Sequence, residues 1–210
     1  MRFFEIDKRH VKCMFGIIGS PIEAFDEMRH EGMGSFALAT LMYLLFFASV
    51  VASRQWTGYL FNMARVEALN IFTMMALSLG LIFLFIVANM AVCTLLDGEG
   101  SLSDVYVTTA YALLPFIMFT PPIILLSNLM SLSEGSYFAL LTTVRFGWSF
   151  LLLFTGNMSA HQFTFKKTVF VGFLSAIGMF ILLFLLFLAF ALTTQFYEFI
   201  RTLYNEIIFR

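Results

Sequence analysis

The sequence contains little charge: only 12% of its 210 residues are charged, whereas 60% are hydrophobic. A soluble domain averages about a quarter charged residues, so this composition excludes a water-soluble globular protein. Basic residues are not in excess either, because 12 Lys and Arg stand against 13 Asp and Glu. This balance excludes the basic surface of a nucleic-acid-binding protein, and we expect no nucleic acid among the partners.

Cysteine and recognisable catalytic motifs are scarce as well. Cys13 follows a charged segment and Cys93 lies in a long apolar run, so the two indicate neither a disulfide framework nor a metal site. The chain has no phosphate-binding P-loop, no HExxH metal motif, no serine elbow and no pair of carboxylates inside an apolar run. We therefore predict that the protein is not an enzyme and expect no cofactor.

Long apolar runs are abundant. A membrane-spanning helix needs about 20 predominantly apolar residues, and five runs contain no Asp, Glu, Lys or Arg. They cover residues 32–53, 68–96, 105–133, 146–165 and 168–197. The sequence thus predicts an all-α integral membrane protein, with a bundle of five transmembrane helices over residues 32–197 and the lipid bilayer as its surroundings.

An amphipathic helix is predicted before the first span. Within the N-terminal segment, residues 1–31, a helix over 20–31 would begin with Ser20 as N-cap, Pro21 at the first position and Glu23 completing a capping box. Its mixed charged and apolar residues are typical of a helix at the membrane interface. The segment carries too many charges for a cleavable signal sequence, so we expect it in the mature protein.

A second amphipathic stretch ends the chain. In residues 198–210 and just before them, Phe196, Phe199 and Leu203 recur at helical spacing, opposite Glu198. Two interpretations stay open, namely a tail along the membrane interface and a plain extension of the fifth helix. Lys and Arg are more frequent on the side of the N-terminus, which predicts a cytoplasmic N-terminus and, with five spans, a C-terminus on the opposite face.

Polar residues inside the spans are candidate functional positions, because they are costly in lipid. Asn89, Asn128 and Asn157 are expected to bond across helix interfaces. His161 is expected at the interfacial end of the fourth span. Arg145 has two interpretations: its guanidinium reaches the interface beside Trp148, or it forms a buried ion pair with an acid such as Glu134.

The third span is interrupted by proline, at Pro115 and at residues 121–122. Each proline removes a backbone donor and bends the helix, and broken helices line cavities in some transporters. A small transporter or channel with a cavity at this helix, lined by Asn128 and Arg145, is therefore one functional hypothesis. Small residues four apart, Ala76 with Gly80 and Gly172 with Ala176, favour close helix packing within the bundle or with a partner.

The loop after the second span is rich in glycine and acid. Asp97, Gly98 and Gly100 with neighbouring acids suggest at first a calcium loop, but the oxygen ligands end at Asp104. A tight turn explains the glycines better, with Ser103 or Asp104 capping the next helix. We therefore expect no metal there.

Three segments together resemble the Yip1-domain family: PIEAF at residues 21–25, LLDGEG at 95–100 and AYALLP at 110–115. The resemblance extends over most of the chain, and the spacing of the last two segments is its most specific part. It implies five membrane spans and a cytoplasmic N-terminus. The motif residues that it singles out, expected to be structural, are Pro21, Asp97, Gly98, Gly100, Tyr111 and Pro115.

The resemblance also suggests a role. Eukaryotic members bind small GTPases through a longer N-terminal region with an Asp-Leu-Tyr-Gly-Pro motif, which this sequence lacks. The compact form is similar to prokaryotic members, many encoded beside carbohydrate ABC transporters, which implies a bacterial cytoplasmic membrane. We expect an accessory or scaffold protein that binds a membrane-protein partner, such as transporter subunits, or itself. Membrane shaping through the amphipathic flanks is a further hypothesis.

Overall fold

The computed structural model describes residues 14, 16–31, 34–62 and 70–208, and this part of the chain contains helices and no strand. Five helical segments are long and apolar enough to cross a membrane, which confirms the predicted all-α, five-span architecture. They are Phe36–Trp56, Ile71–Leu95, Leu102–Leu129, Leu132–His161 and Phe165–Ile208.

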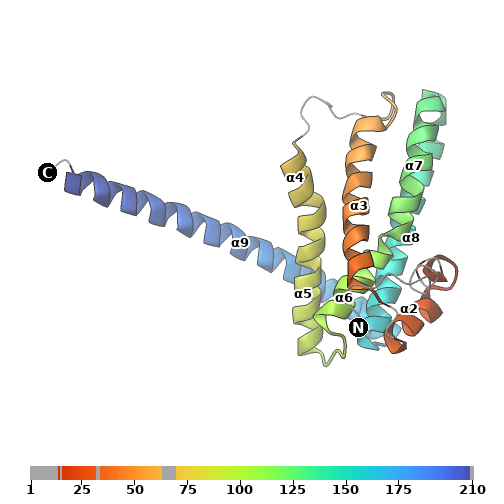
Figure 1. The fold of residues 1–210 in the computed structure, drawn as a ribbon, viewed down its shortest axis with the longest axis horizontal. Helices are drawn as coiled ribbons and strands as arrows, with labels where there is room; N and C mark the ends of the chain where they lie inside the picture. The colour runs from red at the N-terminus through yellow and green to blue at the C-terminus, as the bar shows by residue number, and fades with distance from the viewer. Residues whose placement is uncertain (1–13, 15, 32–33, 63–69, 209–210) are drawn as a thin grey trace.

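Several crossings are built from more than one helix. The elements in chain order are α2 (Pro21–His30), α3 (Phe36–Trp56), α4 (Ile71–Met75), the π-helix η2 (Ala76–Gly80), α5 (Leu81–Leu95), α6 (Leu102–Ala112), α7 (Leu114–Leu129), the 3-10 helix η3 (Leu132–Glu134), α8 (Gly135–His161) and α9 (Phe165–Ile208). In Figure 1, α3, α5 and α7 run side by side, while α2 lies across one end of the bundle. We call this the α2 end, and the other the opposite end.

The third crossing is broken where one of the prolines predicts it. α6 ends at Ala112, the N–H of Leu113 donates to the carbonyl of Ala110 at 3.2 Å, and Pro115 occupies the first turn of α7. A proline fits there because the first turn has no intrahelical acceptor for its N–H. α7 continues through Pro121 and Pro122 without a break, so the interruption expected at these two residues does not occur.

The fourth crossing is longer than the charge-free run predicts. α8 begins at Gly135 instead of residue 146. The sequence prediction started this span after Arg145 because a charge was taken as its boundary. The helix instead accommodates this arginine in its interior, where only 7% of the residue is exposed.

The N-terminal amphipathic helix forms as predicted, except for its cap. Ser20 is the N-cap residue of α2 and Pro21 lies in the first turn, but the Ser20 side chain makes no capping hydrogen bond. The apolar side of α2, with Ala24, Phe25 and Met28 buried, packs against α8. The close approach requires Gly156 on α8, because a Cβ there would lie 3.1 Å from the ring of Phe25.

The core lies near the α2 end, among α2, α3, α6 and α8. Tyr111 and Leu152 are fully buried in it, and the hydroxyl of Tyr43 donates to the carbonyl of Tyr106 at 2.8 Å. The rings of Tyr43 and Tyr106 also contact each other, with centroids 4.9 Å apart. The aromatic residues of the sequence therefore join α3 to α6.

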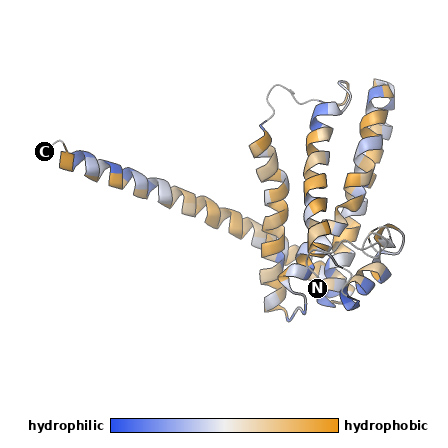
Figure 2. Cartoon of the chain, viewed as in Figure 1, coloured by the Kyte–Doolittle hydropathy of each residue, from blue (hydrophilic) through white to orange (hydrophobic). Residues whose placement is uncertain are grey.

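Of the two interpretations of the C-terminal stretch, a tail along the interface and a plain extension of the fifth helix, the structure shows the extension. Residues 198–208 continue α9, which runs unbroken for 44 residues. The physical reason is that no glycine or proline occurs after Gly178 to end the helix. α9 starts at the α2 end, packs on α5 and α8, and then projects far beyond the bundle (Figure 1). Figure 2 shows that the hydrophobic colouring of α9 gives way to polar residues only toward its far end.

Candidate functional site

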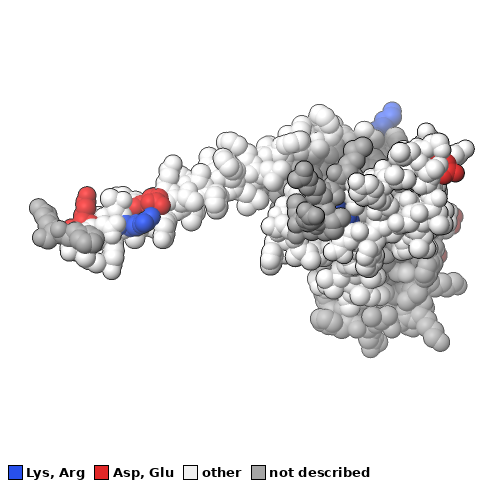
Figure 3. All heavy atoms as spheres, turned by 90° about the horizontal axis from the view of Figure 1, so that it is seen from above, with Lys and Arg blue, Asp and Glu red and all other residues white. Residues whose placement is uncertain are grey.

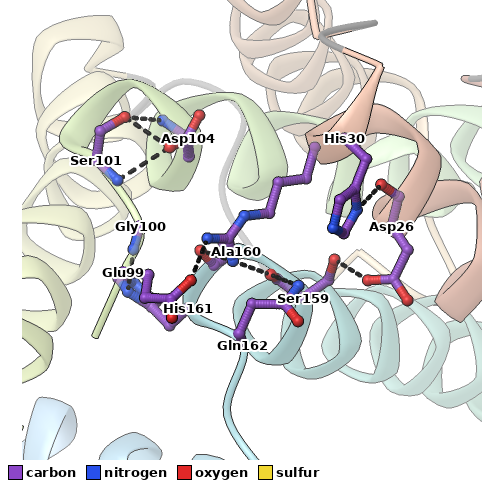
Figure 4. Close-up of polar contacts among 11 residues, drawn as sticks. Asp26, His30, Glu99, Gly100, Ser101, Asp104, Ser159, Ala160, His161 and Gln162 are labelled. Carbon is purple, nitrogen blue, oxygen red and sulfur yellow. Dashed lines mark hydrogen bonds and ion pairs between the residues drawn. The ribbon is translucent and has the colours of Figure 1, made fainter. Parts of the chain in front are cut away.

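Three segments that are far apart in the sequence meet at the α2 end. The last turn of α2, the loop that joins α5 to α6, and the last turn of α8 converge there, as Figure 4 shows. We call the residues whose side-chain or backbone polar groups connect them the α2-end cluster. It consists of Asp26, Arg29, Glu99, Gly100, Ser159, Ala160 and His161.

The loop between α5 and α6 is a tight, fully bonded turn. Asp97 adopts a left-handed conformation, with φ of 54°, and the N–H of Gly98 donates to the carbonyl of Cys93 at 2.8 Å. α6 then starts with a capping box in which Ser101 is the N-cap residue and Asp104 the third helical residue. The prediction that Ser103 or Asp104 caps this helix was thus wrong, because Asp104 supplies the reciprocal bond instead.

The two motif glycines of this loop are required by close approach to α8. A Cβ on Gly100 would lie 2.6 Å from the carbonyl oxygen of Ala160, and one on Gly98 would lie 2.8 Å from Nδ1 of His161. Both distances are shorter than any ordinary carbon contact. Only glycine lets the loop backbone press against the end of α8.

Arg29 is the central side chain of the α2-end cluster. Its Nη1 donates to the carbonyl oxygens of Ser159 and Ala160, both at 2.9 Å, and its Nη2 donates to Glu99 Oε2 at 2.9 Å. The last carbonyls of a helix have no partner within the helix and carry partial negative charge, which a cation stabilises. Arg29 thereby fixes α2 and the loop to the C-terminal end of α8.

Asp26 adds a second link from α2. The hydroxyl of Ser159 donates to Asp26 Oδ1 at 2.5 Å. The same residue of α8 is therefore held through its carbonyl oxygen by Arg29 and through its side chain by Asp26. Hydrogen bonds to charged groups are the strong ones, so the contact between α2 and α8 has a defined register.

His161 lies inside this cluster and not at an exposed interface. The residue is 1% exposed, and its Nδ1 accepts a hydrogen bond from the N–H of Gly100 at 3.3 Å. Because Nδ1 accepts, Nε2 carries the proton of the neutral imidazole. The imidazole ring stacks on the ring of Phe163, with centroids 5.4 Å apart. The amino group of Lys167 lies over the ring of Phe163, 4.1 Å from its centroid.

The contacts of the α2-end cluster connect helices to one another. No three His, Cys, Asp or Glu side chains lie close enough to hold a metal ion in the residues that the structure describes. Each charged group bonds to a helix end or to an opposite charge. Immediately after it, Gln162 adopts a left-handed conformation, with φ of 52°, and turns the chain into α9. The cluster therefore sets the position from which α9 departs.

The three asparagines lie at separate helix contacts. Asn89 is fully buried and donates to Ser175 Oγ of α9 at 3.3 Å, as expected for a bond across a helix interface. Asn128 lies at the opposite end, where it donates to the carbonyl of Trp56 at 2.9 Å. Asn157 lines an apolar groove of about 420 Å³ between α8 and α9.

Arg145 follows neither of its two expected arrangements. It is buried, and no carboxylate lies within ion-pair distance of it in the described part of the chain. Its Nη1 donates to Thr120 Oγ1 at 3.1 Å and to Ser53 Oγ at 3.4 Å. The guanidinium lies 4.3 Å and 5.0 Å from the ring centroids of Phe116 and Phe146. Neutral hydroxyls and aromatic faces thus hold this charge inside the bundle.

An apolar groove of about 730 Å³ lies between α3 and the proline-containing part of α7, but neither Asn128 nor Arg145 is among its lining residues. Asn128 bonds to backbone carbonyls at the opposite end, whereas Arg145 faces Thr120 in the middle of α7. The motif residues Tyr111 and Pro115 are both buried, at or beside the break between α6 and α7. They belong to the packed interior.

A comparison with known protein families gave a match. The family model described as Yip1 domain matches residues 15–192. The chain belongs to the Yip1 family. Comparison with curated proteins and with solved structures gave no match. The matched region runs from the segment before α2 into α9, so the Yip1 domain includes all members of the α2-end cluster.

Four of the motif residues indicated by the sequence, Pro21, Asp97, Gly98 and Gly100, lie in the two Yip1-domain segments that pack against α8. Arg29 and Ser159 were missed as functional partners, because their contact joins residues 130 positions apart. The sequence carried one indication of the role of Arg29, namely its place in the last turn of an amphipathic helix, one turn after the apolar Phe25.

Proposed function

We propose that this Yip1-family protein is a non-enzymatic accessory or scaffold subunit that binds another membrane protein through α9. Carbohydrate ABC transporter subunits are the first candidates for the partner, because the compact sequence resembles prokaryotic members encoded beside such transporters. The observation that carries the proposal is the uncovered surface of α9. Of its 44 residues, only Thr168, Val171 and Ser175 are buried.

The length of α9 supports binding beyond the bundle. At 1.5 Å per residue, 44 residues span about 66 Å, roughly twice the 30 Å of a hydrocarbon core. The helix is therefore too long to serve only as a fifth crossing next to α5. Its surplus gives an apolar and then amphipathic surface that a neighbouring protein would cover.

The groove at the base of α9 offers a seat for a partner helix. Gly172 and Ala176 line it together with Asn157 of α8, and the groove measures about 420 Å³. A Cβ on Gly172 would meet no atom within 4 Å, so this glycine is not used for packing inside the chain. Small residues four apart let a second helix approach closely in lipid.

Photo-crosslinking in the native membrane tests the proposal. A photoreactive amino acid is placed at Phe180 or Phe187 of α9, which are 74% and 71% exposed, and as controls at Leu140 of α8 or Leu125 of α7, which are 61% and 69% exposed. All four positions carry exposed apolar side chains. We expect a protein adduct from the α9 positions and none from the controls, with the partner identified by mass spectrometry.

A matched pair of substitutions tests the groove. Gly172→Leu fills it, whereas Gly147→Leu adds the same side chain to α8, where a Cβ also meets no atom within 4 Å. We expect Gly172→Leu to abolish the adduct and Gly147→Leu to leave it unchanged. Adducts with a second copy of the chain would identify self-association, and a lack of any adduct on α9 would refute the proposal.

A further inference from the structure

A cavity at the opposite end of the bundle has the chemistry of an anion site. It lies between α3, the α4–η2 segment and α8 and measures about 530 Å³, within the range of small-molecule pockets. Its polar lining includes Ser53, Arg54, Thr57 and Ser78. In Figure 3, which looks onto this end, few of the described residues at the surface are charged.

Among the described residues, the charge balance around the cavity is positive. Arg54 lines it and Arg145 lies directly behind Ser53, and neither has a carboxylate within ion-pair distance in the described residues. Glu134, the acid in the described segments that form this end, already accepts from the N–H and hydroxyl of Ser131 at 2.8 Å and 3.1 Å. Two cations that lack a carboxylate partner among the described residues, at the edge of a low-dielectric region, attract an anion.

The hydroxyl groups of the cavity are arranged as donors and acceptors. Because Ser53 Oγ accepts from Arg145, its own proton is directed to another acceptor. Thr57 and Ser78 donate to the carbonyls of Ser53 and Met74, which leaves their oxygens as acceptors facing the cavity. Ser78 lies in the π-helix η2, a distortion often found at functional sites.

The depth of the cavity matches the headgroup region of a bilayer. Arg54 lies in the last turn of α3, next to Trp56, and Tyr59 and Tyr137 are exposed at the same end. Trp and Tyr concentrate at the membrane interface, which places Arg54 at the level of lipid phosphates. Apolar side chains such as Leu77 and Phe138 form the remaining walls.

We propose that this cavity binds a phosphodiester anion through Arg54 and Ser53, with the buried charge of Arg145 behind them. The apolar walls and interfacial depth favour the headgroup of an anionic phospholipid over a water-soluble phosphate ester. The oxygens of Thr57 and Ser78 would accept from hydroxyl groups of the headgroup. This site lies at the opposite end from the base of α9 and does not depend on partner binding there.

Lipid titration of the full-length protein in mild detergent, followed by native mass spectrometry, tests the proposal. Phosphatidylglycerol and phosphatidylcholine with identical acyl chains are compared. We expect at least tenfold tighter binding of phosphatidylglycerol. Arg54→Gln should weaken it about tenfold, or about 1.4 kcal/mol, and Ser53→Ala less. Phosphatidylcholine binding should change less in both variants, because the cationic choline neutralises the charge of its phosphodiester. Arg54 is exposed, so its replacement leaves the core intact.

Arg201→Gln is the control, because Arg201 is an exposed arginine on the far part of α9. Its phosphatidylglycerol affinity should equal that of the unaltered protein. Displacement of the lipid by glycerol 3-phosphate would identify a soluble phosphate ester as a ligand of the same site, and failure to displace it would assign the site to lipid. Equal binding of the two lipids, or equal losses in Arg54→Gln and Arg201→Gln, would overturn the proposal.

Discussion

Replacement of Arg29 by alanine tests whether the α2-end cluster holds the fold together. The substitution removes two hydrogen bonds from a guanidinium to the last carbonyls of α8 and one ion pair with Glu99. Hydrogen bonds to charged groups contribute about 1.5–3 kcal/mol each, and surface ion pairs contribute about 0–1 kcal/mol. Because the two carbonyl bonds share one side chain, we expect Arg29→Ala to cost about 2–4 kcal/mol of unfolding free energy.

Glu99→Gln separates the two contributions. The Glu99 side chain is 68% exposed, so its ion pair with Arg29 is expected to contribute little, under about 1 kcal/mol. Arg29→Lys keeps the positive charge but loses the planar fork that reaches two carbonyls, and should fall between the other variants. Unfolding of each variant is measured by titration with a denaturing detergent. If Glu99→Gln destabilises as much as Arg29→Ala, the carbonyl contacts are not what holds α2 to α8.

Three further predictions use the same unfolding assay. Gly100→Ala should cost about 1–3 kcal/mol, because its Cβ would lie 2.6 Å from a carbonyl oxygen, whereas Gly172→Ala, with no atom within 4 Å, should cost nothing; equal losses would contradict the close-approach argument. Asn89→Ala should cost about 0.6 kcal/mol, as is average for bonds between helices in lipid, and should increase the separation of labels on α5 and α9; unchanged label distances would show that the bond to Ser175 is dispensable. Arg145→Met should be neutral or stabilising, since it removes a buried charge that has no carboxylate partner in the described residues, while it weakens phosphatidylglycerol binding; a large loss of stability would instead show that the arginine is structural.

The sequence was sufficient to predict the number of membrane-spanning segments and their helical structure, because long apolar runs have few other interpretations. It predicted the boundaries of a span less well where a charged residue lies inside the helix. Arg145 was taken as a limit of the fourth span, yet the hydroxyl of Thr120 and the ring of Phe116 hold it within α8. These partners lie on α7, and their proximity depends on packing that no local pattern records.

The α2-end cluster shows the same limit in another form. The glycines at positions 98 and 100 were recognised as turn residues, and their need for backbone freedom is a local property. Their second role, which is to let the loop press against His161, depends on where α8 ends. The contact of Arg29 with α8 likewise joins segments 130 residues apart.

The charged residues at the two ends of the bundle differ in their bonding partners. At the α2 end, charged side chains are bonded to helix termini and to one another, so that α2, the loop and α8 form one unit from which α9 departs. At the opposite end, Arg54 has no carboxylate partner among the described residues and lines an open cavity. Arg29 and Asp26 use their charges for contacts within the chain, whereas the exposed guanidinium of Arg54 can bind an anion that enters the cavity. This contrast agrees with a role of the α2 end in positioning α9 and with the proposed anion site at the opposite end.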